Sequence, residues 1–109
     1  MTPEEHAQAI RDIAPKYGDA KAMRIYLEEF RKSKKAMLMR DALLNGIEAA
    51  THQEREAYSN PKYVQLIKGL ASAIETEETL RWELESHRLD IEIWRSREST
   101  ARAQDKAHL

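Results

Sequence analysis

The sequence has 109 residues, of which 41% are hydrophobic, 34% charged and 6% aromatic, and its 18 basic and 19 acidic side chains leave a formal net charge of -1. This composition is typical of long solvated helices in a single domain, and the charge balance excludes a protein that attracts nucleic acid over its whole surface. The absence of cysteine excludes disulfides and thiolate metal sites. Without an apolar run of about 18 residues or a signal-like start, we expect a cytoplasmic protein that does not contact membranes.

The chain opens with a helix-start signal. Thr2 can cap the amide of Glu5 in a capping box, which predicts a short helix over residues 2–14. Pro15 disfavours helical backbone in the residue before it, and Gly18 permits a turn. The pattern therefore predicts that the first helix ends here and a new one begins at residue 19.

A second helix is predicted over residues 19–57. Steps of three and four give a heptad seam, which consists of Met23, Tyr26, Phe30, Ser33, Met37, Arg40, Leu44, Ile47, Thr51 and Tyr58. The pair Asn45-Gly46 is its weak point, because glycine costs about 1 kcal/mol relative to alanine inside a helix and the pair can also cap one. Ile47 and Thr51 keep the helical phase, so we favour a helix that continues.

A third helix is predicted over residues 60–102, with Asn60 as its N-cap and Pro61 in its first turn. Its heptad seam is the longest in the chain and consists of Tyr63, Leu66, Leu70, Ala73, Glu77, Leu80, Leu84, His87, Ile91, Trp94, Glu98 and Ala101. An apolar seam of this length requires a partner helix along it. Residues 103–109 lose the pattern and are predicted to fray.

Two long helices joined by a short turn predict an all-α fold, namely a long antiparallel helical hairpin, or coiled coil, with a short N-terminal helix. If facing residues have numbers that sum to about 120, large residues meet large ones along both seams. The same register places Arg40 within one turn of Glu77. We interpret these two charges as a pair that fixes the register.

Apolar residues also occur outside the two seams. They are Leu27 and Leu38 on the second predicted helix and Trp82, Leu89 and Ile93 on the third. A broad apolar surface on a helical hairpin favours self-association, so we expect a homo-oligomer, most simply a dimer that forms a four-helix bundle.

No catalytic signature is present, and we expect no enzyme activity, cofactor or metal. The chain has no nucleophile motif and no phosphate-binding glycine loop. Glu83 and His87 stand four residues apart, but the Glu-x-x-His pair of di-iron bundles is missing. His87 is best explained as a seam residue that bonds a neighbour such as Ser33, and His6 as a surface residue.

Basic residues gather toward the predicted open end of the hairpin. Residues 15–40 and 86–109 hold 13 Lys and Arg against 7 Asp and Glu, whereas residues 41–85 hold 4 against 9. Candidate contacts to nucleic acid or an anionic partner are Arg24, Arg31, Lys32, Lys34, Lys35, Arg88, Arg95, Arg97 and Arg102. The alternatives are solvated helix faces with intrahelical ion pairs, or basic and acidic ends that meet in a dimer.

The segments Tyr26–Met39, Leu80–Trp82 and Ile91–Ser96 resemble small helical accessory proteins of tailed bacteriophages and prophages, which are often encoded near recombination genes. This resemblance implies an accessory protein in the bacterial cytoplasm beside DNA replication or recombination. The first hypothesis is therefore a non-enzymatic adaptor that binds DNA or an acidic partner through its basic end. The second is a protein-only binder, either an inhibitor of a host enzyme or defence system or a scaffold, that uses the apolar face around Trp82.

Overall fold

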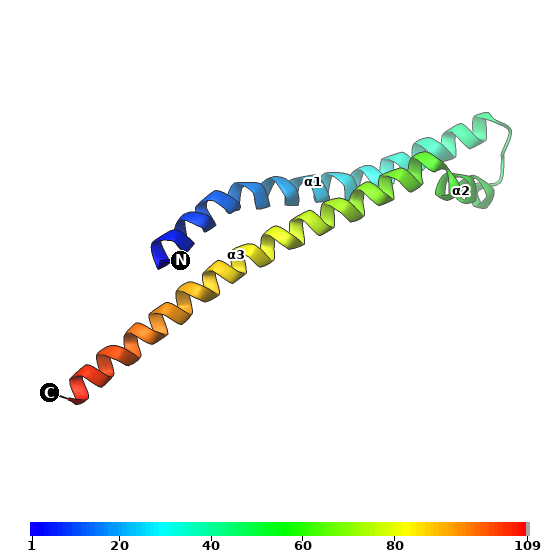
Figure 1. Ribbon diagram of the computed structural model, residues 1–109. Helices are drawn as coiled ribbons and strands as arrows, with labels where there is room; N and C mark the ends of the chain where they lie inside the picture. Colours follow the sequence, from blue (N-terminus) through cyan, green and yellow to red (C-terminus); the bar gives the residue numbers. More distant parts are fainter. Residues whose placement is uncertain (109) are drawn as a thin grey trace. The chain divides into compact units, whose positions relative to one another are not determined.

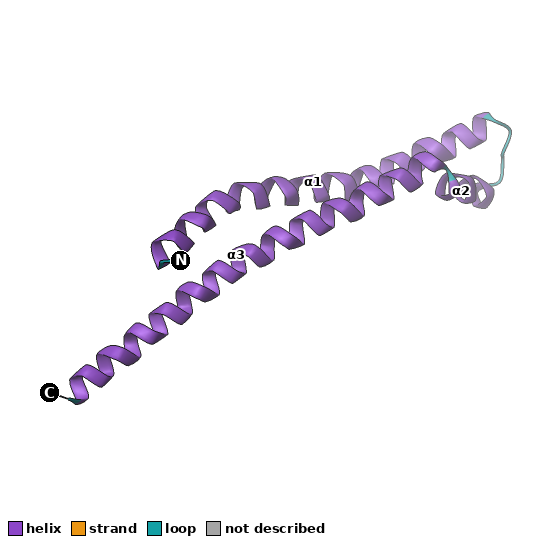
Figure 2. Cartoon of the chain, in the orientation of Figure 1, coloured by secondary structure: helices purple, strands orange, loops and turns teal. Residues whose placement is uncertain are grey.

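The computed structural model describes residues 1–108, and within this range every regular element is an α-helix (Figure 1). Helix α1 spans Pro3–Leu44, α2 spans Ala50–Ser59 and α3 spans Pro61–Ala107. Only short non-helical segments separate them (Figure 2). The all-α helical hairpin predicted from the sequence is confirmed. None of these helices has an apolar stretch long enough to cross a bilayer.

The chain divides into two units. Unit 1 combines residues 1–18 with α3 from Glu78 onward, and unit 2 comprises Asp19–Glu77. Both long helices pass from one unit to the other without interruption. Each unit thus contains one segment of α1 and one of α3, and unit 2 also contains α2.

The turn of the hairpin lies in unit 2 and differs from the prediction. Helix α1 ends at Leu44, where Gly46 adopts a φ of 94°. The Gly46 amide donates to the Leu43 carbonyl, and the Ile47 amide donates to the Ala42 carbonyl, each at 3.0 Å. These two bonds form a Schellman motif, which requires a left-handed residue that glycine adopts at little cost. The predicted continuation of this helix to residue 57 is therefore wrong.

Helix α2 follows, and a tight junction connects it to α3. The Asn60 side chain accepts a hydrogen bond of 2.9 Å from the Lys62 amide, which confirms Asn60 as the N-cap of α3 with Pro61 in the first turn. The small core of unit 2 contains the buried side chains of Leu38, Ala42, Ala57 and Leu70. All three helices contribute to this core.

The predicted pairing of Arg40 with Glu77 is wrong. Glu77 is buried and accepts hydrogen bonds from Arg24, whereas Arg40 is exposed. The numbers of the true pair sum to 101, because the hairpin turns over residues 45–60 with α2 inserted and not at residue 60 alone. Inserting a short helix shifts the register by several turns.

The seam predicted on α3 is confirmed over residues 63–91, where every third or fourth residue is buried or half-buried. The seam predicted on α1 is displaced by one position. The side chains of α1 that are shielded from solvent include Tyr17, Ala20, Arg24, Leu27, Arg31, Lys34 and Leu38, again with steps of three and four. The predicted line through Met23 and Tyr26 is largely exposed.

Unit 1 contains two further corrections. The predicted turn at Pro15–Gly18 is absent, because α1 runs through both residues with the heptad phase of Ile13 and Tyr17 unbroken. The predicted fraying from residue 103 is also wrong up to Ala107, since the segment contains no glycine or proline and carries helix-favouring alanines. Leu109, the last residue of that prediction, lies outside the described residues.

Candidate functional site

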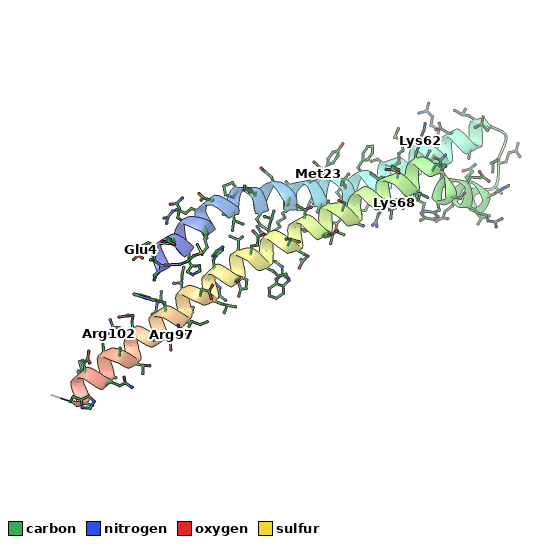
Figure 3. The ribbon with its side chains drawn as sticks, in the orientation of Figure 1. Glu4, Met23, Lys62, Lys68, Arg97 and Arg102 are labelled. Atoms are coloured by element: carbon green, nitrogen blue, oxygen red, sulfur yellow. The ribbon has the colours of Figure 1, made fainter. Side chains whose placement is uncertain are left out.

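Two lines of exposed apolar side chains are the main surface features of the described residues. The first, here called the α1 apolar line, lies in unit 2 and consists of the exposed Met23, Tyr26, Met37 and Leu44 together with Phe30, which is half-buried. Figure 3 shows Met23 on the side of α1 that faces away from α3. The rings of Tyr26 and Phe30 stack with their centroids 5.8 Å apart and their planes 8° from parallel. The exposed fractions of Tyr26 and Leu44 are 59% and 74%, so the chain itself leaves this line uncovered.

The second, the α3 apolar line, lies in unit 1 and consists of Trp82, Leu89 and Ile93. Their spacings of seven and four place them on one face of the helix. Trp82 is 58% exposed, and its ring is contacted by the Arg81 guanidinium at 4.6 Å from the centroid. Intrahelical ion pairs recur every seven residues along the same stretch and join Glu78 with Arg81, Glu85 with Arg88 and Glu92 with Arg95. These pairs support the helix on which the line is displayed.

Two of the five predicted interface residues lie elsewhere. Leu38 is buried in the core of unit 2, and Leu27 is half-buried in the α1 seam. Both belong to the line of α1 residues that packs against α3, which lies one residue further along the sequence than the predicted seam. Their assignment as exposed interface residues is therefore wrong, whereas Trp82, Leu89 and Ile93 are exposed as an interface requires.

The nine predicted anion-binding residues do not lie together in one unit. Arg24, Arg31, Lys32, Lys34 and Lys35 lie in unit 2, and Arg88, Arg95, Arg97 and Arg102 lie in unit 1. Five of them already form ion pairs with carboxylates, namely Arg24, Lys32, Lys35, Arg88 and Arg95. Among residues 1–108 no carboxylate pairs with Arg31, Lys34, Arg97 or Arg102. Figure 3 shows Arg97 and Arg102 on the C-terminal part of α3.

The acidic partners of the basic stretch in unit 2 come from the same unit. Residues 19–40 carry seven basic and three acidic side chains, and residues 41–77 carry three basic and six acidic ones. Lys35 donates to Glu54 of α2 at 2.8 Å, and its ammonium group lies 4.7 Å from the centroid of the Tyr58 ring. The hydrogen bond from Lys35 holds the pKa of Glu54 below its usual value. The charge separation within unit 2 therefore runs between neighbouring helices and joins α1 to α2.

A polar contact that the sequence did not reveal joins Arg24 to two carboxylates. The guanidinium donates to Glu77 across the helix pair and to Glu28 one turn along α1, at 3.0 Å for each oxygen of Glu28. Its bonds to both carboxylates raise the pKa of Arg24, with Glu77 as the larger cause. The seam position of Glu77 indicated a buried charge, but only the true register identifies its partner.

Histidines link the two segments of unit 1. The Nδ1 atoms of His6 and His87 are 2.8 Å apart, so one ring donates and the other accepts, and Nε2 of His6 lies 3.7 Å from Asp90. The predictions that His6 is a surface residue and that His87 bonds Ser33 are therefore wrong. The described residues contain no group of three or more potential metal ligands. We interpret the contact as a structural link between the segments.

A shallow apolar groove of about 580 Å³ lies on the first turns of α3, where it is lined by Pro61, Lys62, Gln65, Leu66 and Gly69. The polar side chains that line the groove are those of Lys62 and Gln65. These two groups alone offer few contacts to orient a reacting substrate. Comparison with models of known protein families, with curated proteins and with solved structures finds no match to this chain.

Proposed function

We propose that the protein is a non-enzymatic interaction module that binds a protein partner through the α3 apolar line. The observation that carries this proposal is the exposure of Trp82, Leu89 and Ile93 on one face of an ion-pair-supported helix. Tryptophan is enriched among residues that dominate the energy of protein interfaces, and large apolar side chains aligned on a helix fit a partner's groove. The wider class is an adaptor, scaffold or inhibitor.

Site-specific photocrosslinking in cells that express the protein tests this proposal. A photoreactive phenylalanine analogue replaces Trp82 in one variant and Ser99, an exposed residue of the same helix, in the control. We expect a discrete protein adduct from position 82 and none from position 99. The identified partner is then purified, and Trp82→Ala should weaken its binding while leaving helicity unchanged, because the ring is largely exposed. Equal adducts at both positions, or none, would contradict the proposal.

An accessory role in DNA recombination or replication is the second candidate, as the resemblance to phage proteins implies. The observation in its favour is that Arg31, Lys34, Arg97 and Arg102 have no carboxylate partner among residues 1–108. Binding of labelled single- and double-stranded oligonucleotides at low and moderate salt tests this role, because neutralised phosphates make affinity fall steeply with salt. Salt-sensitive binding that Arg97→Glu with Arg102→Glu abolishes would favour DNA; no binding at low salt would exclude this role.

A further inference from the structure

The exposed α1 apolar line has the geometry of a second coiled-coil seam. Its members, with Ser33 and Arg40 in the gaps, follow steps of three and four from Met23 to Leu44. Such steps keep residues on one side of a helix that pairs with another helix. The neighbouring heptad phase of α1 is already used against α3 within unit 2. One helix therefore displays two adjacent seams, of which the chain itself covers only one.

The α1 apolar line leaves large side chains accessible to a second helix. The exposed fractions of Met23, Tyr26, Met37 and Leu44 are 53%, 59%, 52% and 74%. A specific interface needs roughly 800 Å² from each partner. Only four hydrophobic side chains among the described residues are buried, so covering more apolar surface would add substantially to the core.

We infer that a second copy of this chain covers the α1 apolar line, with the two α1 helices antiparallel about a two-fold axis. When residue numbers sum to about 70, the seam residues from Tyr26 to Leu44 face one another across the two helices. Phe30 meets Arg40 of the second copy, where a guanidinium can lie over the ring, and Ser33 meets Met37. Tyr26 meets Leu44 in the same register. The two-fold axis generates each of these contacts twice.

Charges beside the seam support this choice of occupant. Lys34 follows Ser33, and Asp41 follows Arg40, so both flank the seam on the same side, with Lys34 half-buried between the two seams. The numbers of Lys34 and of Asp41 in the second copy sum to 75, five more than those of facing seam residues, so the two residues are offset by about 7.5 Å along the helix axes, a distance that the lysine side chain can span. Within the described part of one chain, neither side chain has an ion-pair partner, and the same holds for Arg40. Three charged side chains that are unpaired in one chain thus acquire partners in the dimer.

This inference stands apart from the proposed function, because it uses α1 of unit 2 and not the α3 apolar line of unit 1. Sedimentation equilibrium of the full chain measures the dimer directly. Tyr26→Glu should yield a monomer, whereas Ile25→Glu, which changes a comparably exposed apolar residue of α1 outside the seam, should still dimerise; the exposed fractions of Tyr26 and Ile25 are 59% and 46%. Circular dichroism verifies that both variants remain helical. A wild-type monomer up to millimolar concentration, or a dimer that Trp82→Ala disrupts and Tyr26→Glu does not, would overturn the inference.

A charge swap tests the register. Lys34→Asp and Asp41→Lys should each weaken the dimer about tenfold, the scale of two exposed ion pairs turned repulsive. The double swap should restore the affinity of the wild type, because each reversed charge again meets its opposite. Failure of the double variant to recover would reject the pairing of Lys34 with Asp41.

Spin labels test the antiparallel orientation, and the natural absence of cysteine makes single labels straightforward. Labels at Lys32→Cys and at Ile25→Cys should be separated along the helix axes by about 9 Å and about 30 Å, from a rise of 1.5 Å per residue. A parallel pair would bring both labels equally close, and that result would refute the antiparallel arrangement.

Discussion

Replacing Gly18 by alanine distinguishes a continuous α1 from a helix that breaks at Pro15–Gly18. In the structure Gly18 lies inside α1, and a Cβ atom at this position would meet no neighbouring atom within 4 Å. Alanine is therefore accommodated without strain and removes the conformational entropy that glycine loses on folding. If the residue instead occupied a turn with positive φ, alanine would be strained and the sign of the effect would reverse.

The expected gain is about 1 kcal/mol in the free energy of unfolding, the difference between glycine and alanine inside a helix. For a domain of this size that gain raises the thermal midpoint by about 4–8 °C. Thermal unfolding followed by circular dichroism at fixed protein concentration measures it. Gly46→Ala is the matched control and should lower the midpoint, because φ is 94° at that position. A lower midpoint for Gly18→Ala would refute the continuous helix.

Two ion pairs give further predictions. Glu77→Gln should lower the thermal midpoint because it leaves the guanidinium of Arg24 without its buried partner, and the apolar double replacement Arg24→Met with Glu77→Leu should recover much of the loss. For the Lys35 pair, the pKa of Glu54 is lowered in the folded chain, so the pair stabilises the fold above the ordinary carboxyl pKa and this contribution is lost as pH falls through the lowered value. Urea unfolding should therefore show that Lys35→Met is destabilising at pH 7 and progressively less so as the pH falls, while Lys32→Met stays close to neutral throughout.

The sequence predicts α3 well because several signals agree there. A cap at Asn60, a proline in the first turn and one uninterrupted apolar seam define both the start and the buried face, and the structure confirms them over residues 63–91. The exposure of the α3 apolar line also follows from the sequence, since one partner helix cannot cover two faces. In this segment local preference and tertiary packing require the same arrangement.

At two places local sequence signals do not determine where α1 ends. Pro15 and Gly18 each disfavour a helix in their surroundings. Helix α1 nevertheless continues on both sides of them, from Pro3 to Leu44. Asn45-Gly46 could be either a tolerated interruption or a cap, and the Schellman hydrogen bonds decide in favour of a cap. The register depends on this choice, because inserting α2 changes which residues face each other. Local propensity alone could not identify Arg24 as the partner of Glu77.

The choice of which heptad line of α1 faces α3 also depends on the register, and it explains why an apolar line remains exposed. Helix α1 carries two heptad lines one residue apart, and α3 can cover only one of them. The internal line contains Arg24, Arg31 and Lys34, and the buried Glu77 compensates the charge of Arg24. The line left outside is the more apolar of the two, with Met23, Tyr26 and Met37 exposed. The inferred dimer would cover this exposed apolar line, and the charge-swap experiment on α1 tests whether it does.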